Sequence, residues 1–338
     1  MGHQKISAVI LAAGKGTRMK SSRAKVLHEV NFQPMIHHVL DAVTPLDLHQ
    51  IILVTGHQRH MVEKSCSHYH LDCVEQQTQL GTGHAVLAAE HCIGEDVSVV
   101  MILCGDTPLI RSDTLQNMLS EHLSRGNFLT VMTTEMSDPA NYGRILTDDN
   151  GYVIGIVEEK DASPEEKRIT EINAGIYCVN AEFLFASLKQ IGTDNKQGEM
   201  YLTDIVALAH AAEQPVRKFQ CADPEEVLGV NSRRELSMAN CQLQYRVLDD
   251  LMMSGVTIDK PSTVTVEKTV TVGSDSVLGP NVFICGKTDI GNDCTVEPFC
   301  YIADCQIGNN VTIGTGSYLK NYVLEDGNIV PPHSRLVK

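Results

Sequence analysis

Residues 271–296 read TVGSDSVLGPNVFICGKTDIGNDCTV, and an aliphatic side chain returns at every sixth position of this stretch. The series continues on both sides, with a single five-residue step between Ile302 and Ile307. Its ten members are Val266, Val272, Leu278, Ile284, Ile290, Val296, Ile302, Ile307, Ile313 and Leu319. Glycine or an acidic residue often follows the aliphatic position, and a small or β-branched residue often stands four positions after it.

A six-residue repeat is typical of a parallel β-helix, in which each repeat forms one short face and three repeats complete a coil. An ordinary sandwich of short strands would instead show alternation with hairpin turns every 8–12 residues. We therefore predict a parallel β-helix of about four coils over residues 256–338. Such prisms resemble those of hexapeptide-repeat proteins, which are left-handed and usually trimeric, so we expect a left-handed β-helix and a homotrimer.

The first ~230 residues have a different pattern, since short apolar runs alternate with helix-like stretches. The predicted strands are 7–13, 51–55, 97–104 and 128–133, and the predicted helices are 34–43, 84–92 and 113–123. Pro34 suits the first turn of a helix, and Asp113 could cap one. Buried strands that alternate with helices predict an α/β domain with a Rossmann-like, mostly parallel sheet over residues 1–231. Residues 232–255 have a helical pattern and are predicted to be a connecting arm.

The composition limits the partners and the compartment of the chain. Its 338 residues contain 27 Lys and Arg against 42 Asp and Glu, a net charge of −15 without a basic stripe, so we expect no nucleic-acid partner. No polybasic run favours an anionic membrane surface, and no stretch of ~18 apolar residues is long enough to span a membrane. The eleven cysteines form no C-x-x-C pair. We expect a reduced, soluble, cytoplasmic protein.

The first strand runs into a glycine-rich segment, LAAGKGTR at residues 11–18, and Lys25 follows shortly after it. Glycines after a strand let backbone N–H groups approach an anion, so this loop is a candidate phosphate site. A Rossmann fingerprint needs a third glycine where Met19 stands, and the Gly-Lys-Ser/Thr of a Walker A loop is absent. The alternative is a loop that only turns the chain, but Arg18 and Lys25 favour the phosphate site.

Two further segments carry polar groups at the ends of predicted strands. Asp106 follows the most apolar strand, at the edge where open α/β sheets bind ligands, and a carboxylate there suits Mg²⁺. Residues 76–84, QQTQLGTGH, offer amides that can pair with a nucleobase. Taken alone, the first segment could be a turn and the second a polar loop before a helix.

Eight segments match, in chain order, the motifs of one family: residues 11–25, 76–84, 105–109, 142–144, 156–161, 171–175, 197–204 and 229–233. Together they resemble the bacterial N-acetylglucosamine-1-phosphate uridylyltransferases, the pyrophosphorylase half of a bifunctional enzyme, over essentially residues 5–320. The resemblance implies a sugar nucleotidyltransferase that makes UDP-N-acetylglucosamine and pyrophosphate from UTP and N-acetylglucosamine 1-phosphate.

The resemblance also implies a role for individual residues. The catalytic residues would be Arg18, against the triphosphate, and Lys25, on phosphate in the transition state. The nucleotide would be bound by Leu11, Ala12, Gly14, Gly16, Thr17, Gln76, Gln79, Gly81 and Thr82. The sugar would be bound by Gly143, Glu158, Asn173, Tyr201 and Thr203. A Mg²⁺ cofactor would be bound by Asp106 and Asn231, a pairing that the residues alone do not suggest.

The implied chemistry needs positioning and charge neutralisation rather than a nucleophilic side chain. An oxygen of the sugar phosphate, already anionic, attacks the α-phosphorus of UTP in line while pyrophosphate leaves. Two departures from the family adjoin this site: Ala24 stands where the family usually has proline, and Cys104 where it commonly has tyrosine. They keep another acceptor or nucleotide open, such as glucose 1-phosphate.

Two interpretations from other classes compete with this enzyme. One is a non-catalytic trimer that binds sugar nucleotides, which would not need the whole phosphate and metal set. The other is a hexapeptide acyltransferase, which needs a histidine base facing a groove between subunits. After His210 the chain has only His333, in its last segment, and the β-helix is shorter than in the bifunctional enzyme. We therefore expect no acetyltransferase activity.

Overall fold

The computed structural model describes residues 4–338. The chain forms two compact units, which divide within the long helix α7 (Arg233–Met253). The first unit holds the residues up to Glu29 together with Gln33–Leu236, and the second holds Val30–Phe32 together with Ser237–Lys338. In the described part of the chain, no helix combines the length and the apolar character needed to cross a membrane.

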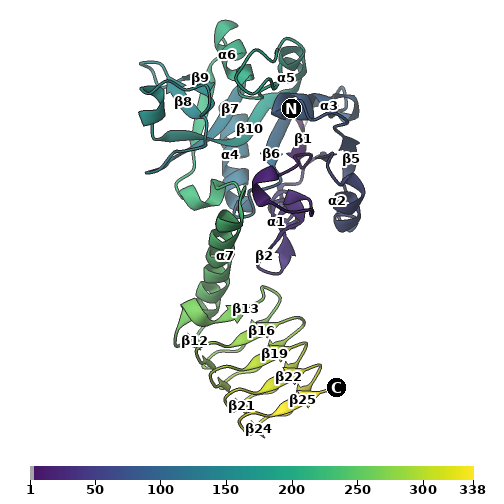
Figure 1. Cartoon of the computed structure of the whole chain (residues 1–338), viewed down its shortest axis with the longest axis vertical. Helices are drawn as coiled ribbons and strands as arrows, with labels where there is room; N and C mark the ends of the chain where they lie inside the picture. Colours follow the sequence, from purple (N-terminus) through teal and green to yellow (C-terminus); the bar gives the residue numbers. More distant parts are fainter. Residues whose placement is uncertain (1–3) are drawn as a thin grey trace. The chain divides into compact units, whose positions relative to one another are not determined.

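A twisted sheet forms the centre of the first unit (Figure 1). Its strand order is β11-β7-β10-β6-β1-β4-β5. The strands are β1 (Lys5–Leu11), β4 (Gln50–Thr55), β5 (Asp72–Glu75), β6 (Val97–Cys104), β7 (Leu129–Glu135), β10 (Glu171–Asn180) and β11 (Val216–Gln220). Only β10 runs antiparallel to its neighbours on this path through the described strands, so the predicted mostly parallel sheet is confirmed.

Two short strand pairs accompany this sheet. The strands β8 (Arg144–Thr147) and β9 (Val153–Val157) pair with each other, and β8 joins the sheet through β10. The strands β2 (Glu29–Val30) and β3 (Gln33–Pro34) form a separate two-stranded pair.

Apolar layers cover both faces of the sheet, because successive side chains of a strand point to opposite faces. Along β1, Ala8 and Ile10 join one buried cluster and Val9 joins the other. The first cluster contains residues of α1 and α4, and the second contains residues of α3, α5 and α6. The helices are α1 (Met35–Val43), α2 (Arg59–Ser65), α3 (Thr82–Ala88), α4 (Ser112–Ser124), α5 (Ala181–Leu188) and α6 (Asp204–Ala211).

Helix boundaries are where the local predictions fail. Helix α1 begins at Met35, and Pro34 is its N-cap residue rather than part of its first turn. Arg111 is the N-cap residue of α4, so the predicted cap by Asp113 is wrong. Asp113 lies inside the first turn, where its negative charge still interacts favourably with the helix dipole.

The second unit is a left-handed parallel β-helix, as the six-residue repeat and the hexapeptide resemblance predict (Figure 1). Its strands stack in three parallel sheets. The first sheet contains β12 (Thr257–Ile258), β15 (Val277–Leu278), β18 (Thr295–Val296), β21 (Thr312–Ile313) and β24 (Ile329–Val330). The second contains β13 (Thr265–Val266), β16 (Phe283–Cys285), β19 (Tyr301–Ala303), β22 (Tyr318–Lys320) and β25 (Arg335–Val337). The third contains β14 (Thr271–Val272), β17 (Asp289–Ile290), β20 (Gln306–Ile307) and β23 (Val323–Leu324).

The aliphatic repeat positions are buried and stack in register. In one sheet Ile284 lies beside Ile302, which lies beside Leu319. The five-residue step after Ile302 keeps this register, because it shortens a corner and leaves the next inward position, Ile307, beside Ile290. The shortened corner contains Asp304 at φ +54°, a left-handed conformation that Asp and Asn adopt more readily than most residues.

Candidate active site

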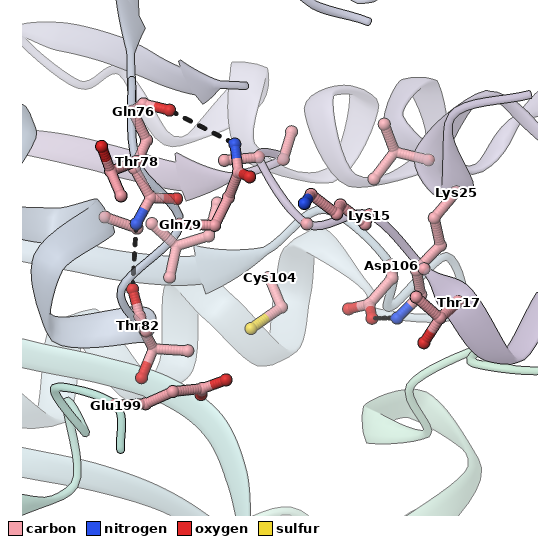
Figure 2. A pocket seen from close by; sticks show the side chains of 18 of the residues that line it. Lys15, Thr17, Lys25, Gln76, Thr78, Gln79, Thr82, Cys104, Asp106 and Glu199 are labelled. Carbon is pink, nitrogen blue, oxygen red and sulfur yellow. Dashed lines mark hydrogen bonds and ion pairs between the residues drawn. The ribbon is translucent and has the colours of Figure 1, made fainter. Parts of the chain in front are cut away.

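A cavity of about 620 Å³ opens at the carboxyl ends of β1 and β6, where parallel strands place the segments that follow them at the same edge of the sheet. The nine residues predicted to bind the nucleotide all line it. Lys25 and Asp106 line it as well. Figure 2 shows the Lys25–Asp106 pair on one side, the glutamine side chains of residues 76 and 79 on the other, and Cys104 between them. The structure thus gathers most of the phosphate, base and metal candidates around one space, although Arg18 and Asn231 are not among the residues that line it.

The two glycines of the loop after β1 have different surroundings. Gly16 has φ +59°, and a Cβ atom there would lie 2.6 Å from Lys25 Cβ. Only glycine therefore allows Lys25 to pack against this turn. A Cβ atom on Gly14 would meet no atom within 4 Å. The absent side chain of Gly14 leaves open space in the cavity wall, which is what a loop that approaches phosphates closely requires.

A compact polar cluster joins the two predicted catalytic residues to the two predicted metal ligands. Asn231 Oδ1 accepts hydrogen bonds from Arg18 Nη2 at 2.8 Å and from Lys25 Nζ at 2.6 Å. Lys25 Nζ also forms an ion pair with Asp106 Oδ2. The side chains of Lys25 and Asp106 are 12% and 19% exposed, so this pair is less screened by solvent than a surface ion pair.

Backbone contacts hold the segments of Asp106 and Asn231 together, although they are distant in sequence. The Val230 N–H donates to the Asp106 carbonyl oxygen at 2.8 Å. The Asn231 N–H donates to the Glu235 carboxylate at 2.7 Å, and the Glu235 N–H donates to Ser232 Oγ at 3.3 Å. Ser232 and Glu235 form the S-x-x-E pattern of a helix start, so the beginning of α7 orients Asn231.

The segment predicted to bind the base is fixed by its own hydrogen bonds. Gln76 is buried, and its Nε2 donates to the Gly81 carbonyl at 3.0 Å and contacts His84 Nδ1 at 3.1 Å. Gly81 has φ +116°, and a Cβ atom there would lie 2.5 Å from the Met200 carbonyl oxygen. The Met200 N–H in turn donates to the Leu80 carbonyl at 2.7 Å. The Gln-rich segment is thereby tied to residues 200–203.

Four of the five predicted sugar-binding residues lie together. Thr203 Oγ1 donates to Glu158 Oε1 at 3.3 Å. A Cβ atom on Gly143 would lie 2.9 Å from Ile156 Cγ2 and 3.6 Å from both Glu158 Oε1 and Asn173 Cβ. Asn173 is held in turn, because its Oδ1 accepts the Gly175 N–H at 2.9 Å. Gly143 therefore packs closely against Ile156, and a side chain at this position would have to displace a neighbour.

The fifth predicted sugar-binding residue, Tyr201, faces a neighbouring cavity of about 400 Å³ that Glu158 also lines. Its hydroxyl donates to Asp161 Oδ2 at 3.2 Å and accepts from Gln197 Nε2 at 2.7 Å. Burial is the main cause that raises the pKa of Tyr201 to about 12. Tyr201 is therefore neutral at physiological pH.

Burial also shifts two titratable groups at the centre of the site. The pKa of Glu158 is raised above its usual 4.5, mainly by burial and further by the nearby carboxylates of Asp204, Asp161 and Glu199. The pKa of the Cys104 thiol is raised to about 12, again mainly by burial and further by Asp106. A neutral thiol is a poor nucleophile, so the geometry does not favour covalent chemistry at Cys104.

The sequence did not single out Lys15, Thr78 and Glu199, which also line the larger cavity. The position of Lys15 between two glycines was the available signal for that residue. Glu199 precedes Met200, and no sequence signal links it to the loop after β1. Among residues 4–338, no cluster of three or more His, Cys, Asp and Glu could hold a metal ion.

Comparison with known proteins gives consistent matches along the chain. A nucleotidyl transferase family model matches residues 7–224, and a model of the bacterial transferase hexapeptide repeat matches residues 287–321. "Bifunctional protein GlmU" of Desulfotalea psychrophila is 44% identical over 330 residues, which cover 98% of this chain and 97% of that protein. The protein of the same name from Geotalea uraniireducens is 42% identical, and the match covers 98% of this chain and 73% of that protein. The one from Heliobacterium modesticaldum is 44% identical, and the match covers 97% of this chain and 71% of that protein.

Proposed function

This chain belongs to the nucleotidyl transferase family, and on that premise we propose that it transfers a uridylyl group from UTP to N-acetylglucosamine 1-phosphate. The products are UDP-N-acetylglucosamine and pyrophosphate. The observation that best supports the proposal is the contact of Arg18 and Lys25 with Asn231, and of Lys25 with Asp106, beside the glycine-rich loop. The family resemblance found in the sequence is confirmed by these relatives.

The reaction needs no activated side chain, because the nucleophile is already an anion. A sugar-phosphate oxygen forms a bond to the α-phosphorus of UTP while the bond between that phosphorus and the bridging oxygen to the β-phosphate breaks. The electron pair leaves with pyrophosphate. Arg18 and Lys25 offset the negative charge that gathers on these phosphates, and the open space at Gly14 lets them approach the loop backbone.

Asp106 and Asn231 would hold the Mg²⁺ ion that the family implies. Their side-chain oxygens already converge on one cationic group, the ammonium of Lys25. One carboxylate and one amide oxygen fit Mg²⁺, which usually takes its other ligands from water and substrate phosphates. When bound, the ion supplies positive charge to the phosphates of the substrate.

The sugar is proposed to lie against Gly143, Glu158, Asn173, Tyr201 and Thr203. Gly143 lies beside the Glu158 carboxylate and the Asn173 side chain. Above its raised pKa, the Glu158 carboxylate can accept hydrogen bonds from sugar hydroxyls. An amide and a carboxylate together suit an acceptor that carries both hydroxyl and acetamido groups.

Pyrophosphate release tests the substrate assignment. The four nucleoside triphosphates are each combined with N-acetylglucosamine 1-phosphate or glucose 1-phosphate, in Mg²⁺ or in EDTA. We expect rapid release only from UTP with N-acetylglucosamine 1-phosphate in Mg²⁺. A preference for glucose 1-phosphate would assign another acceptor. No release from any pair would refute the enzyme and leave a non-catalytic trimer that binds sugar nucleotides.

Lys25→Ala tests the phosphate role in the same assay. We expect it to lower kcat far more than it raises KM for the sugar 1-phosphate, because Lys25 acts on the phosphates rather than on the sugar. Arg23→Ala is the matched control, since Arg23 is a nearby cation whose pairing with Glu29 is solvent-exposed. Unchanged turnover of Lys25→Ala would refute its assignment.

We also propose that these 338 residues form a homotrimer and do not transfer acetyl groups. The hexapeptide repeats support the trimer. His333 is the one histidine in residues 256–338, and its side chain is exposed rather than held beside a ligand cavity. Light scattering should give the mass of three chains, and acetyl-CoA should not be consumed when it is added to the substrate panel.

A further inference from the structure

We infer that Gln58 is a positioning residue for Lys25, which it controls by clamping the backbone of residues 22–24. This inference rests on the proposed function, because it assigns to Gln58 an effect on the step that Lys25 assists. Gln58 does not line the cavity and therefore acts through the loop.

The clamp uses both ends of one amide side chain. Gln58 Oε1 accepts the Ala24 N–H at 2.7 Å, and Gln58 Nε2 donates to the Ser22 carbonyl oxygen. Lys25 follows Ala24 directly and begins a 3₁₀ turn, Lys25–Leu27, in which the Leu27 N–H donates to the Ala24 carbonyl at 3.0 Å. Fixing Ala24 therefore fixes where the Lys25 side chain leaves the backbone.

Gln58 is itself anchored to the glycine-rich loop. The His57 N–H donates to the Ala13 carbonyl at 3.2 Å, and a Cβ atom on Gly56 would lie 3.0 Å from Ala13 Cβ. Gln58 is also the N-cap residue of α2, and its carbonyl accepts the Met61 N–H at 2.9 Å. The clamp thus sets the position of the Lys25 loop relative to the loop that is proposed to bind the phosphates.

Solvent-exposed contacts cannot replace this clamp. Arg23 and Glu29 form an ion pair at 3.2 Å, but their side chains are 45% and 53% exposed. Exposed ion pairs contribute little and hold geometry weakly. The Gln58 amide contacts two main-chain groups. Its bond to the N–H of Ala24, a residue only 2% exposed, is partly buried, whereas its bond to the Ser22 carbonyl is exposed.

The backbone conformation of Ala24 provides a way to test the clamp. Ala24 has φ −53° and ψ 137°, values that proline adopts without strain. A proline at this position lacks the N–H that Gln58 accepts, but its ring holds φ in the same range. Proline at position 24 and the Gln58 amide are therefore two independent means of holding one loop conformation.

The experiment compares wild type, Gln58→Ala, Ala24→Pro and the double variant by steady-state pyrophosphate release. Gln58 has φ +54°, and alanine also carries a Cβ atom, so the first substitution removes the amide without new backbone strain. We expect Gln58→Ala to lower kcat about 10- to 100-fold, because a misplacement of about 1 Å near a reacting group has effects of this size. KM for the sugar 1-phosphate should change little. Lys64→Ala, an exposed change on the same helix, is the control.

The double variant decides between positioning and a general role in stability. Ala24→Pro alone should stay within about threefold of wild type, and adding it to Gln58→Ala should restore most of the lost kcat. Amide hydrogen exchange of residues 20–27 should be faster in Gln58→Ala and slow again in the double variant. An unchanged kcat in Gln58→Ala, or no rescue by Ala24→Pro, would overturn the inference.

Failure of the proposed function gives a different result. In that case wild type releases no pyrophosphate from any substrate pair, and the exchange measurement alone tests the clamp. Exchange that is the same in wild type and Gln58→Ala would then refute it, and faster exchange with rescue by proline would support the clamp without a catalytic role.

Discussion

Replacing Gly16 with alanine tests how the glycine-rich loop and Lys25 depend on each other. At φ +59° a residue other than glycine lowers the free energy of unfolding by about 1–2 kcal/mol. The new Cβ atom would also lie 2.6 Å from Lys25 Cβ, which belongs to the stem of the side chain rather than to a flexible end. The clash can therefore be relieved only by moving one of the two backbones.

The size of the shift follows from the contact distance. Carbon atoms in contact prefer about 3.5–4.0 Å, so the two segments must separate by about 1 Å. A displacement of this size near the reacting groups lowers kcat by about 100-fold. We therefore expect Gly16→Ala to lose about 1–3 kcal/mol of stability and to lower kcat strongly.

Gly14→Ala is the matched control on the same loop. Its Cβ atom would meet no atom within 4 Å, and its backbone is outside the left-handed region. Stability should be unchanged or higher by about 0.4–1 kcal/mol, because alanine restricts the unfolded chain. The methyl group would occupy space in the proposed phosphate cradle, so KM for UTP should rise.

Urea unfolding and steady-state pyrophosphate release measure these quantities on the two variants and wild type. Equal losses of stability in Gly14→Ala and Gly16→Ala would contradict the reasoning about backbone conformation. Wild-type kcat in Gly16→Ala would contradict the link to Lys25.

Three further predictions concern stability. Burial lowers the pKa of His122 from 6.5 to about 4, so its contribution to the free energy of unfolding should fall as the pH drops from about 6.5 towards 4. In urea unfolding across this range, the free energy of unfolding of His122→Gln should decline less than that of wild type. Burial raises the pKa of Glu158 in the folded chain above 4.5, so the fold loses stability as the pH rises from about 4.5 through this raised pKa. Glu158→Gln should therefore be more stable than wild type near pH 7 and equal to it below about pH 4. An equal difference at both pH values would refute this. Ile302→Ala in the fully buried core of the β-helix should cost about 2–5 kcal/mol, whereas Ile329→Ala, at a side chain 77% exposed, should stay within about 0.5 kcal/mol by thermal unfolding.

Local patterns predicted the elements better than their ends. The apolar run Val97–Cys104 is observed as β6 with the same bounds, because a buried parallel strand must be apolar on both faces. The start of α4 was wrong by one to two residues, because several nearby polar residues can serve as a helix cap. Caps depend on the path of the preceding loop, which short-range patterns do not specify.

The candidate site, too, could be predicted only in part from the local sequence. The loop after β1 and Asp106 were recognisable as candidates from residue type and position at strand ends. Their partner Asn231 was not, because nothing near it in the sequence indicates a ligand and only the resemblance suggested the pairing. The hydrogen bond from the Val230 N–H to the Asp106 carbonyl is a long-range contact that exists only in the folded chain.

The sequence by itself determined the two architectures. The spacing of the aliphatic positions indicates which side chains must be buried, and both folds follow from burying them. It also suggested candidate roles for the individual loops. Only the tertiary structure decided how those loops meet: why Gly16 must lack a side chain, why Gln58 reaches Ala24, and how Lys25 lies between Asp106 and Asn231. The physical reason is that periodicity depends on neighbours within a few residues, whereas a polar site forms where segments distant in sequence converge at the same edge of a sheet.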